Sequence, residues 1–260
     1  MKSSNQTEIR EAFSRQADGF ESAHMNFSSK EYLGYVVSKI APEKTDTILE
    51  VAAGTCACGR AIAPHVAKVT CLDITPAMLS IGKETAKAER IENIDFVIGD
   101  AAELPFPDNS FDIVLSRLAF HHFPDINQPF AEMVRVLKPS GKLVLIDMEA
   151  AEEPLRKIAD SIEKMRDSSH VRNLSQKEMF SLYRKHGMTV SCRETVRMPM
   201  ILQNWLDHTK TPETIQSEIK TLMKKEISGG KKTGFSPYCH GGEVYFDHRW
   251  VLMIGSVEIG

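Results

Sequence analysis

The spacing of hydrophobic residues changes near residue 45 of this chain. Before that point apolar residues recur at helical intervals, which predicts amphipathic helices over residues 5–20 and 32–40. After it come short apolar runs that predict strands, over residues 47–51, 69–73, 95–100, 111–116 and 142–147. Segments of helical period lie between several of these strands, over residues 58–65, 76–88 and 127–137. Strands that alternate with helices of this length predict βαβ crossovers and a parallel sheet with helices on both faces.

Beyond residue 150 the pattern is looser. It predicts three helices, over residues 152–166, 175–186 and 212–227. It also predicts strands over residues 188–198 and 243–257, of which the second is rich in β-branched and aromatic residues. We expect these strands to extend the same sheet.

The composition narrows the class of protein that carries this sheet. The 260 residues are 42% hydrophobic and include 32 Lys+Arg against 35 Asp+Glu. Because nucleic-acid-binding proteins concentrate Lys and Arg, the near-neutral balance argues against a nucleic-acid partner. Five cysteines are an odd number in a chain with a large core, so we expect reduced thiols and a cytoplasmic protein. No apolar run approaches the ~20 residues of a membrane span, so none is predicted.

The candidate chemistry lies in the turns after the strands, because ligands of open parallel sheets bind at the strands' carboxyl ends. Residues 52–54 are small and let a ligand approach the backbone closely. Asp73 ends the second strand, 23 residues after Glu50, at a place suited to ribose hydroxyls. Its alternative role is to cap the following helix, which Thr75 could equally do. Asp100 ends the third strand and could accept a hydrogen bond from an exocyclic amine.

The first turn does not suit a dinucleotide. Glu50 lies where the pyrophosphate of a dinucleotide would be repelled. A ligand with a ribose and a cationic amino group fits this acid better, and S-adenosylmethionine has both.

Four segments, taken in order, resemble the motif series of class I S-adenosylmethionine-dependent methyltransferases. They are ILEVAAGTCACG, CLDITPAML, GDAAELPFPDNSFDIVLSRLAFHHFPD and RVLKPSGKLVLID, and they span roughly residues 47–147. The resemblance is to the branch that includes ubiquinone and menaquinone biosynthesis methyltransferases and many uncharacterised bacterial relatives. It implies a Rossmann-like α/β fold with a seven-stranded, mostly parallel sheet whose last strand is antiparallel. It also implies S-adenosyl-L-methionine as the cofactor.

The resemblance also implies which residues hold that cofactor. Asp73 with Ile74 would hold the ribose, and Asp100 with Ala101 would hold the adenine, with Leu104 packed nearby. The full set of implied cofactor residues is Glu50, Ala52, Gly54, Thr55, Asp73, Ile74, Met78, Asp100, Ala101 and Arg117.

Two features depart from the family pattern. In the usual GxGxG loop the first glycine is Ala52 here and the third is Cys56. Cys56 adds bulk where the cofactor passes the backbone, so it weakens binding or reshapes the turn. The N-terminal signature of the quinone enzymes is missing, which argues against a quinone acceptor. The segment FSRQADGF instead resembles the family's lid helix, with Phe20 where a Tyr is frequent.

Methyl transfer from a sulfonium is an in-line displacement, which requires alignment and exclusion of water more than a nucleophilic residue. For an oxygen or nitrogen acceptor a general base would help, and His121 and His122 are the candidates. Local packing of either histidine is the alternative, and we expect at most one to face the pocket. Arg117 could pair with the cofactor carboxylate, with a substrate anion, or with a surface carboxylate.

Other residues could border the acceptor pocket, although each has a simpler explanation. A charged run like the first group is more often a solvated face, and aromatic residues like the second group are more often part of the core. The charged residues are Arg166, Asp167, His170 and Arg172, and the aromatic residues are Trp205, Tyr245 and Phe246.

Two other functions stay open at this stage. The chain could be a catalytically silent S-adenosylmethionine-binding regulatory or scaffold protein, given Cys56 in the cofactor loop. It could also be a thiol-dependent metalloid methyltransferase using Cys56, Cys58 and Cys71. Because CxxC pairs and a fourth ligand are missing, we predict no metal site and expect small buried thiols.

The predicted organisation has three parts. Residues 1–43 form an N-terminal helical lid, and residues 44–150 form the S-adenosylmethionine-binding core. Residues 151–260 form a helical substrate-side insertion and the last two strands of the same sheet. The expected partner is a small-molecule acceptor, without nucleic acid, and a homodimer stays open.

Overall fold

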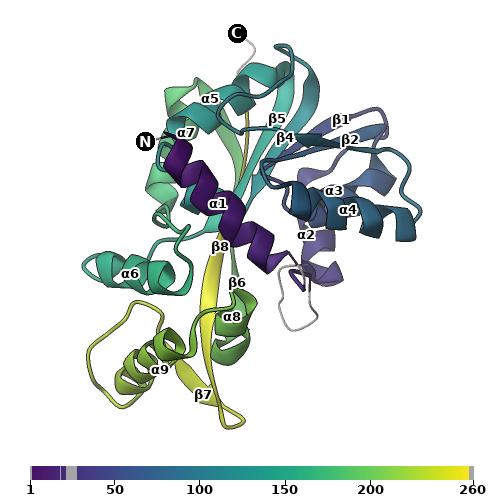
Figure 1. The fold of residues 1–260 in the computed structure, drawn as a ribbon. Helices are drawn as coiled ribbons and strands as arrows, with labels where there is room; N and C mark the ends of the chain where they lie inside the picture. Colours follow the sequence, from purple (N-terminus) through teal and green to yellow (C-terminus); the bar gives the residue numbers. More distant parts are fainter. Residues whose placement is uncertain (1, 18, 22–27, 258–260) are drawn as a thin grey trace.

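The computed structural model describes residues 2–17, 19–21 and 28–257 (Figure 1). Asp18, which belongs to the predicted lid segment, lies outside the described residues. Within the described residues, no helix is long and apolar enough to cross a membrane.

The strands of the described chain form one sheet. Their bounds are Thr47–Val51 (β1), Lys68–Asp73 (β2), Ile94–Ile98 (β3), Phe111–Arg117 (β4), Leu137–Met148 (β5), Met188–Ile201 (β6), Tyr238–His240 (β7) and Glu243–Val257 (β8). The order along the sheet is β3-β2-β1-β4-β5-β8-β6, and β7 pairs with β8 outside this path. The pairs from β3 to β5 are parallel, and β8 is antiparallel to both of its neighbours. This confirms the predicted seven-stranded, mostly parallel sheet with an antiparallel last strand; β7 is an addition of three residues.

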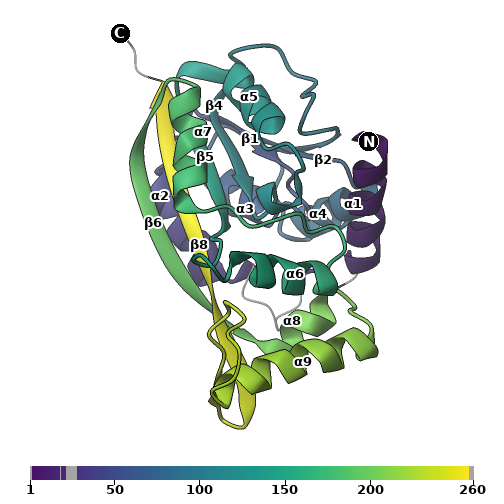
Figure 2. The same cartoon turned by 90° about the vertical axis from the view of Figure 1, so that its left-hand side faces the viewer.

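Helices surround this sheet and the ends of its strands. Their bounds are Lys2–Gln16 (α1), Lys30–Ile40 (α2), Ala57–Ile62 (α3), Pro76–Ala88 (α4), Asn127–Val136 (α5), Arg156–Arg166 (α6), Gln176–Lys185 (α7), Leu202–His208 (α8) and Glu213–Ile227 (α9), with short 3-10 turns at Ala63–His65 (η2) and Phe120–His122 (η3). The buried residues of α2, α3 and α4 pack on one face of the sheet, and those of α5 and α7 on the other. Figure 2 shows α6, α8 and α9 together at one end of the molecule, away from α5.

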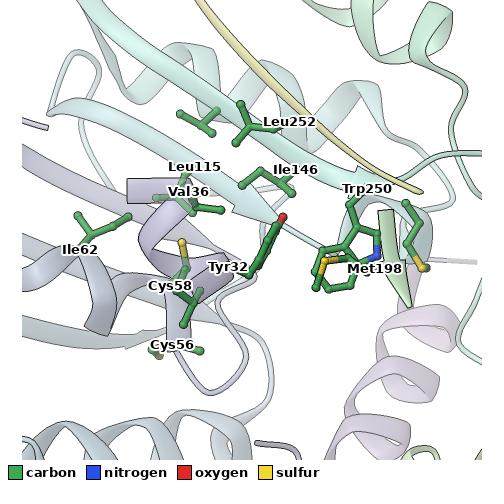
Figure 3. Packing of buried hydrophobic residues seen from close by; sticks show 14 of the residues in the cluster. Tyr32, Val36, Cys56, Cys58, Ile62, Leu115, Ile146, Met198, Trp250 and Leu252 are labelled. Carbon is green, nitrogen blue, oxygen red and sulfur yellow. The ribbon is translucent and has the colours of Figure 1, made fainter. Parts of the chain in front are cut away.

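The pleat of the strands separates the two layers of the core. Along β1, Ile48 faces the α2 and α3 layer whereas Leu49 and Val51 face the α5 and α7 layer. Figure 3 shows the first layer, where Tyr32 and Val36 of α2 lie against strand residues. The same alternation turns Glu50 toward the layer that contains α3, which matters for the site below.

Several predicted boundaries were wrong. The first helix ends at Gln16 instead of residue 20. Helix α8 was not predicted because its seven residues are too short for a periodicity signal beside the apolar end of β6. Strand β6 runs past its predicted end and includes Pro199, which the free edge of a sheet tolerates because no ladder hydrogen bond is lost there.

Candidate active site

The loop after β1 has an unusual backbone. Residues 52, 54 and 56 all have left-handed conformations, with φ values of 54°, 54° and 61°. These are the three glycine positions of the GxGxG pattern considered in the sequence analysis, and here two of them are Ala52 and Cys56. A residue with a Cβ pays about 1–2 kcal/mol for this conformation, so the loop holds its shape at a cost in stability. Gly54 is not tightly packed, because an added Cβ would meet only Met78 Cε within 4 Å, at 3.9 Å.

We expect Cys56→Gly to be more stable than Cys56→Ala. Both changes remove the buried Sγ, but only glycine adopts a φ of 61° without strain. The free energy of unfolding should be larger for the glycine variant by about 1 kcal/mol, measured by urea denaturation. Equal stability of the two variants would contradict a left-handed Cys56.

Asp73, at the end of β2, is tied to this loop. Its Oδ2 accepts a hydrogen bond of 2.7 Å from the Gly54 N–H, and its Oδ1 accepts one of 2.8 Å from the Thr75 N–H. Burial raises the pKa of Asp73 above its ordinary value, although both backbone donors oppose this shift. A carboxylate offers about four acceptor positions, so each oxygen can accept a further hydroxyl donor from a ligand. The capping alternative is not realised, because Asp73 binds the N–H of Thr75, which precedes α4, and the Thr75 side chain makes no cap.

Asp100 lies at the end of the next strand along the sheet edge. Its Oδ1 accepts from the Ala102 N–H at 2.9 Å, and its Oδ2 accepts from Gln6 Nε2 of α1 at 2.6 Å. Helix α1 therefore reaches the carboxylate that was predicted to hold an exocyclic amine.

A cavity of about 330 Å³ connects these loops to the segments beyond residue 150. This volume is in the ~300–1,000 Å³ range of small-molecule pockets. Its lining includes both predicted catalytic histidines, His121 and His122, and residues of α1. Eight of the ten predicted cofactor residues also line it, namely Ala52, Gly54, Thr55, Asp73, Ile74, Asp100, Ala101 and Arg117.

Glu50 and Met78 are not among the lining residues. Glu50 faces α3, where its Oε2 accepts a hydrogen bond of 2.7 Å from the Gly59 N–H. Gly59 permits this approach, because an added Cβ would lie 2.7 Å from the same oxygen. Met78 is fully buried behind Gly54. Both residues therefore support the loop from behind, and the geometry does not favour direct contact with a ligand.

The buried Glu50 should make stability depend on pH. Burial raises the pKa of Glu50 to about 7, and the charge of Arg117 opposes that rise only in part. Between pH 4.5 and 7 the folded state then binds more protons than the unfolded state, so stability falls as pH rises through this window. The size of this pKa difference corresponds to about 3 kcal/mol. The Glu50→Gln variant lacks this titrating group, so its stability should not fall in the same way. The difference between its free energy of unfolding and that of the wild type should therefore increase from pH 4.5 to pH 7. Parallel curves would contradict a protonated Glu50.

His121 is held by Asp147 at the end of β5. The distance between His121 Nδ1 and Asp147 Oδ1 is 2.6 Å, and the His121 backbone N–H also donates to Asp147 Oδ2, at 3.2 Å. Burial lowers the pKa of His121, but the charge of Asp147 outweighs burial and keeps that pKa above its ordinary value. Because an ionised carboxylate only accepts, Nδ1 carries the proton in the neutral ring and Nε2 is the basic nitrogen.

His122 belongs to a second network. Ser169 Oγ donates to Asp167 Oδ1 at 2.6 Å, so His122 Nδ1 must donate to Ser169 Oγ, at 3.1 Å. Burial, together with the neighbouring His121, lowers the pKa of His122 to about 3 and keeps the ring neutral. Helix α1 completes the network, because Gln16 Nε2 donates to Asp167 Oδ2 and the Phe13 ring packs edge-on against His122. Both histidines therefore border the cavity, and the expectation that at most one would do so was wrong.

The other candidates divide between cavity and core. Arg166, Asp167 and His170 line the cavity, whereas Arg172 pairs with Glu178 outside it. The residues considered for an aromatic wall, Trp205, Tyr245 and Phe246, are not among the lining residues, and Trp205 and Phe246 are fully buried in the core.

Sequence analysis missed several residues of the site. They are Gln6, Gln16, Asp147, Glu163, Ser169, His208 and His248. Asp147 had a detectable signal, because it ends a predicted strand in the same way as Asp73 and Asp100. The others lie on elements that only the tertiary structure brings to the cavity.

The cysteines in and near the loop after β1 are not placed for thiolate chemistry. Cys56, Cys58 and Cys71 are fully buried, and none of them lines the cavity. Burial raises the pKa values of Cys58 and Cys71 well above the ordinary range. Within the described part of the chain, no three His, Cys, Asp or Glu side chains are grouped to hold a metal ion.

Comparison with known proteins points to one family. Residues 49–145 match a family described as "Methyltransferase domain". The chain is 30% identical to an uncharacterised methyltransferase, YcgJ, of Bacillus subtilis (strain 168). The match extends over 222 residues, which are 85% of this chain and 87% of that protein. The crystal structure of YcgJ matches with a TM-score of 0.80 at 26% identity, over 89% of this chain and 100% of that one.

Two further relatives extend the comparison. The uncharacterised protein YafE of Escherichia coli (strain K12) is 35% identical over 175 residues, which are 67% of this chain and 84% of that protein. A demethylmenaquinone methyltransferase of Listeria welshimeri is 40% identical, but over only 108 residues, which are 40% of this chain and 46% of that protein. Similarity to the quinone enzyme is thus limited to less than half of either chain.

Proposed function

Because this chain belongs to the class I S-adenosylmethionine-dependent methyltransferases, we propose that it methylates a small molecule enclosed in the cavity between α1, the strand ends and α6. The single observation that carries the proposal is the composition of the cavity wall. Side chains suited to the cofactor, such as Asp73, and a carboxylate-bound histidine, His121, line the same space.

The chemistry of the donor set fits the cofactor. Asp73 and Asp100 are acceptors for ribose hydroxyls and for the adenine amine, while Ile74 and Ala101 supply apolar surface. Gly54 lines the cavity, and without a side chain it lets a ligand approach the loop backbone. We therefore assign Ala52, Gly54, Thr55, Asp73, Ile74, Asp100, Ala101 and Arg117 to the cofactor, with Glu50 and Met78 as supports of the loop.

When bound, S-adenosylmethionine supplies a methyl group on a sulfonium, which leaves as a neutral thioether. The protein then has to align the acceptor and exclude water. Helix α1 serves both purposes, because Gln6 and Gln16 attach it to Asp100 at one end of the cavity and to Asp167 at the other.

His121 is the stronger candidate for the general base. The charge of Asp147 raises the pKa of His121 by more than burial lowers it. Burial instead lowers the pKa of His122 to about 3. A base with a pKa nearer the working pH removes a proton more efficiently, so His121 takes the acceptor proton at Nε2. His122, fixed by Ser169, orients the acceptor through its own Nε2.

The predicted division of the chain needs one change. We assign the cofactor to residues 44–150 and the choice of acceptor to residues 151–260, which also complete the sheet. Within the predicted lid of residues 1–43, we assign the lid role to α1 alone, because α2 packs on the sheet. The limited overlap with the quinone methyltransferase supports a different acceptor for this chain.

The size of the acceptor can be tested directly. Release of S-adenosylhomocysteine from S-adenosylmethionine would be measured with a panel of small phenols, alcohols and amines, and separately with RNA and with unfolded protein. We expect turnover with small molecules only. Turnover confined to RNA or protein would contradict an enclosed acceptor site.

A further inference from the structure

Four aromatic rings follow one another along the cavity wall, apart from the loops assigned to the cofactor. They are the rings of His122, Phe13, Phe20 and His208, in that order, and all four residues line the cavity. Successive ring centroids lie 5.0, 6.2 and 4.9 Å apart. We call these four residues the ring row. It joins η3, the lid segment and α8, which are distant from one another in the sequence.

The two phenylalanines of the ring row are not part of the hydrophobic core. Within the described residues, neither belongs to the two buried layers that pack on the sheet, and both are half-buried. A single half-exposed apolar residue on the outer surface of a protein is ordinary. Phe13 and Phe20 differ from that case, because both line the cavity and contact each other. Their remaining apolar surface is therefore stabilised when a ligand covers it.

The rings of the row are inclined to one another and not stacked. Their planes meet at 80° between His122 and Phe13, and at 60° between Phe13 and Phe20. The angle between Phe20 and His208 is 48°. Aromatic rings pair best in such edge-to-face or in offset arrangements, with centroids about 4.5–7 Å apart. The spacing of the row is in this range, so a further planar ring in the cavity can contact two successive members in the same way.

The ring row begins beside the proposed general base. The ring centroid of His121 lies 4.1 Å from that of His122. A ligand ring that packs against His122 and Phe13 can therefore direct a substituent toward His121. The rest of such a ligand extends along the row toward Phe20 and His208.

The ring row carries no charge near neutral pH. Burial lowers the pKa values of His122 and His208 to about 3, so both imidazole rings are neutral. Arg166, whose charge also acts on His208, is already paired with Glu163 at 3.0 Å. A ligand that packs on the row therefore needs no charged group of its own there.

We propose that the ring row binds a planar aromatic ring of the methyl acceptor. The ligand ring packs against Phe13 and Phe20, with His122 and His208 at the two ends, and its nucleophilic substituent points toward His121. This inference rests on the proposed function, because the ring row lies in the cavity that is assigned to methyl transfer. It specifies the acceptor as an aromatic or heteroaromatic compound. A saturated molecule of similar size is disfavoured, because it lacks the positive edge and negative face that aromatic pairs use.

The test compares benzyl alcohol with cyclohexylmethanol, which share a hydroxymethyl group and differ in the ring. Their dissociation constants would be measured by ligand-observed NMR on the full chain saturated with S-adenosylhomocysteine. We expect benzyl alcohol to bind about ten-fold more tightly, because aromatic contacts contribute beyond the area that they bury. Hydrophobicity alone would favour cyclohexylmethanol, which has the larger apolar surface. Equal binding, tighter binding of cyclohexylmethanol, or no binding of either fragment would overturn the subsite.

Variants then show whether the preference comes from the ring row. Phe13→Leu and Phe20→Leu each keep an apolar side chain but remove a ring, so the preference for benzyl alcohol should fall about three-fold in each. In the double variant the two fragments should bind about equally. The matched control is Phe180→Leu, because Phe180 of α7 is 36% exposed and is not among the described lining residues; there the preference should be unchanged. An unchanged preference in the double variant would also overturn the subsite.

The failure of this inference can be told from failure of the proposed function. S-adenosylhomocysteine binding is measured on the same samples by isothermal titration, which also shows that each variant is folded. If the cofactor product does not bind to the wild type, the proposed function fails whatever the fragments do. If it binds and cyclohexylmethanol still equals benzyl alcohol, only the subsite fails.

Discussion

Replacing Asp73 by Ala is expected to weaken the binding of S-adenosylhomocysteine about 100-fold or more. The carboxylate is assigned to two ribose hydroxyls, and hydrogen bonds to a charged group contribute about 1.5–3 kcal/mol each. It also holds the Gly54 and Thr75 backbone, so its loss releases the loop that contacts the ligand. Isothermal titration calorimetry measures the effect.

Two further variants make this result interpretable. Asp73→Asn keeps the shape and one oxygen acceptor, so we expect a smaller loss of affinity, about ten-fold. Asp95→Ala is the matched control, because this neighbouring aspartate on β3 is 56% exposed and pairs only with Lys68 among the described residues. Its affinity should equal that of the wild type. Unchanged affinity in a folded Asp73→Ala would show that the ribose lies elsewhere.

Asp147→Asn is expected to lower kcat about 10²–10⁴-fold with little change in S-adenosylhomocysteine affinity. The amide can no longer hold the proton on His121 Nδ1 as an ionised carboxylate does, so Nε2 is not reliably the basic nitrogen. Turnover would be measured with the acceptor found by the metabolite experiment described last. Asp112→Asn, at the opposite end of β4 from His121, is the control and should retain the wild-type kcat.

The pH profile separates a general base from a structural role. A base must be deprotonated, so wild-type activity should rise as pH increases through the raised pKa of His121, above 6.5. Without the Asp147 charge that pKa falls, and the rising limb should move to lower pH in Asp147→Asn. A profile with the same midpoint in both proteins would contradict the assignment of His121 as the base.

The sequence predicted the cavity residues at the strand ends better than those contributed by the rest of the chain. Ala52, Asp73 and Asp100 were found because strand ends in a parallel sheet meet at one edge, so their position follows from local patterns. The exceptions were Glu50 and Met78, which do not line the cavity. The sequence position of Glu50 suggested a ligand contact, but the pleat of β1 turns its side chain toward α3. The sequence hides this orientation, because a short, fully buried strand shows no alternation of polar and apolar residues.

The cavity wall beyond residue 150 depends on long-range packing. His248 reaches Glu163 because the antiparallel strand β8 passes between β5 and β6 and brings its first half beside α6. Nothing near residue 248 or residue 163 in the chain indicates the other. His208 lies on α8, a helix too short to be predicted, and it also lines the cavity. Such residues can be found only when the fold is known.

The most direct test of the account follows the methyl group itself. The purified protein would be incubated with S-adenosylmethionine labelled with a trideuterated methyl group and a small-molecule cell extract, and labelled products would be identified by mass spectrometry. We predict a labelled small molecule that is absent with Asp73→Ala and greatly reduced with Asp147→Asn. Tight binding of S-adenosylhomocysteine without any labelled product would contradict the account and would favour a catalytically silent cofactor-binding protein.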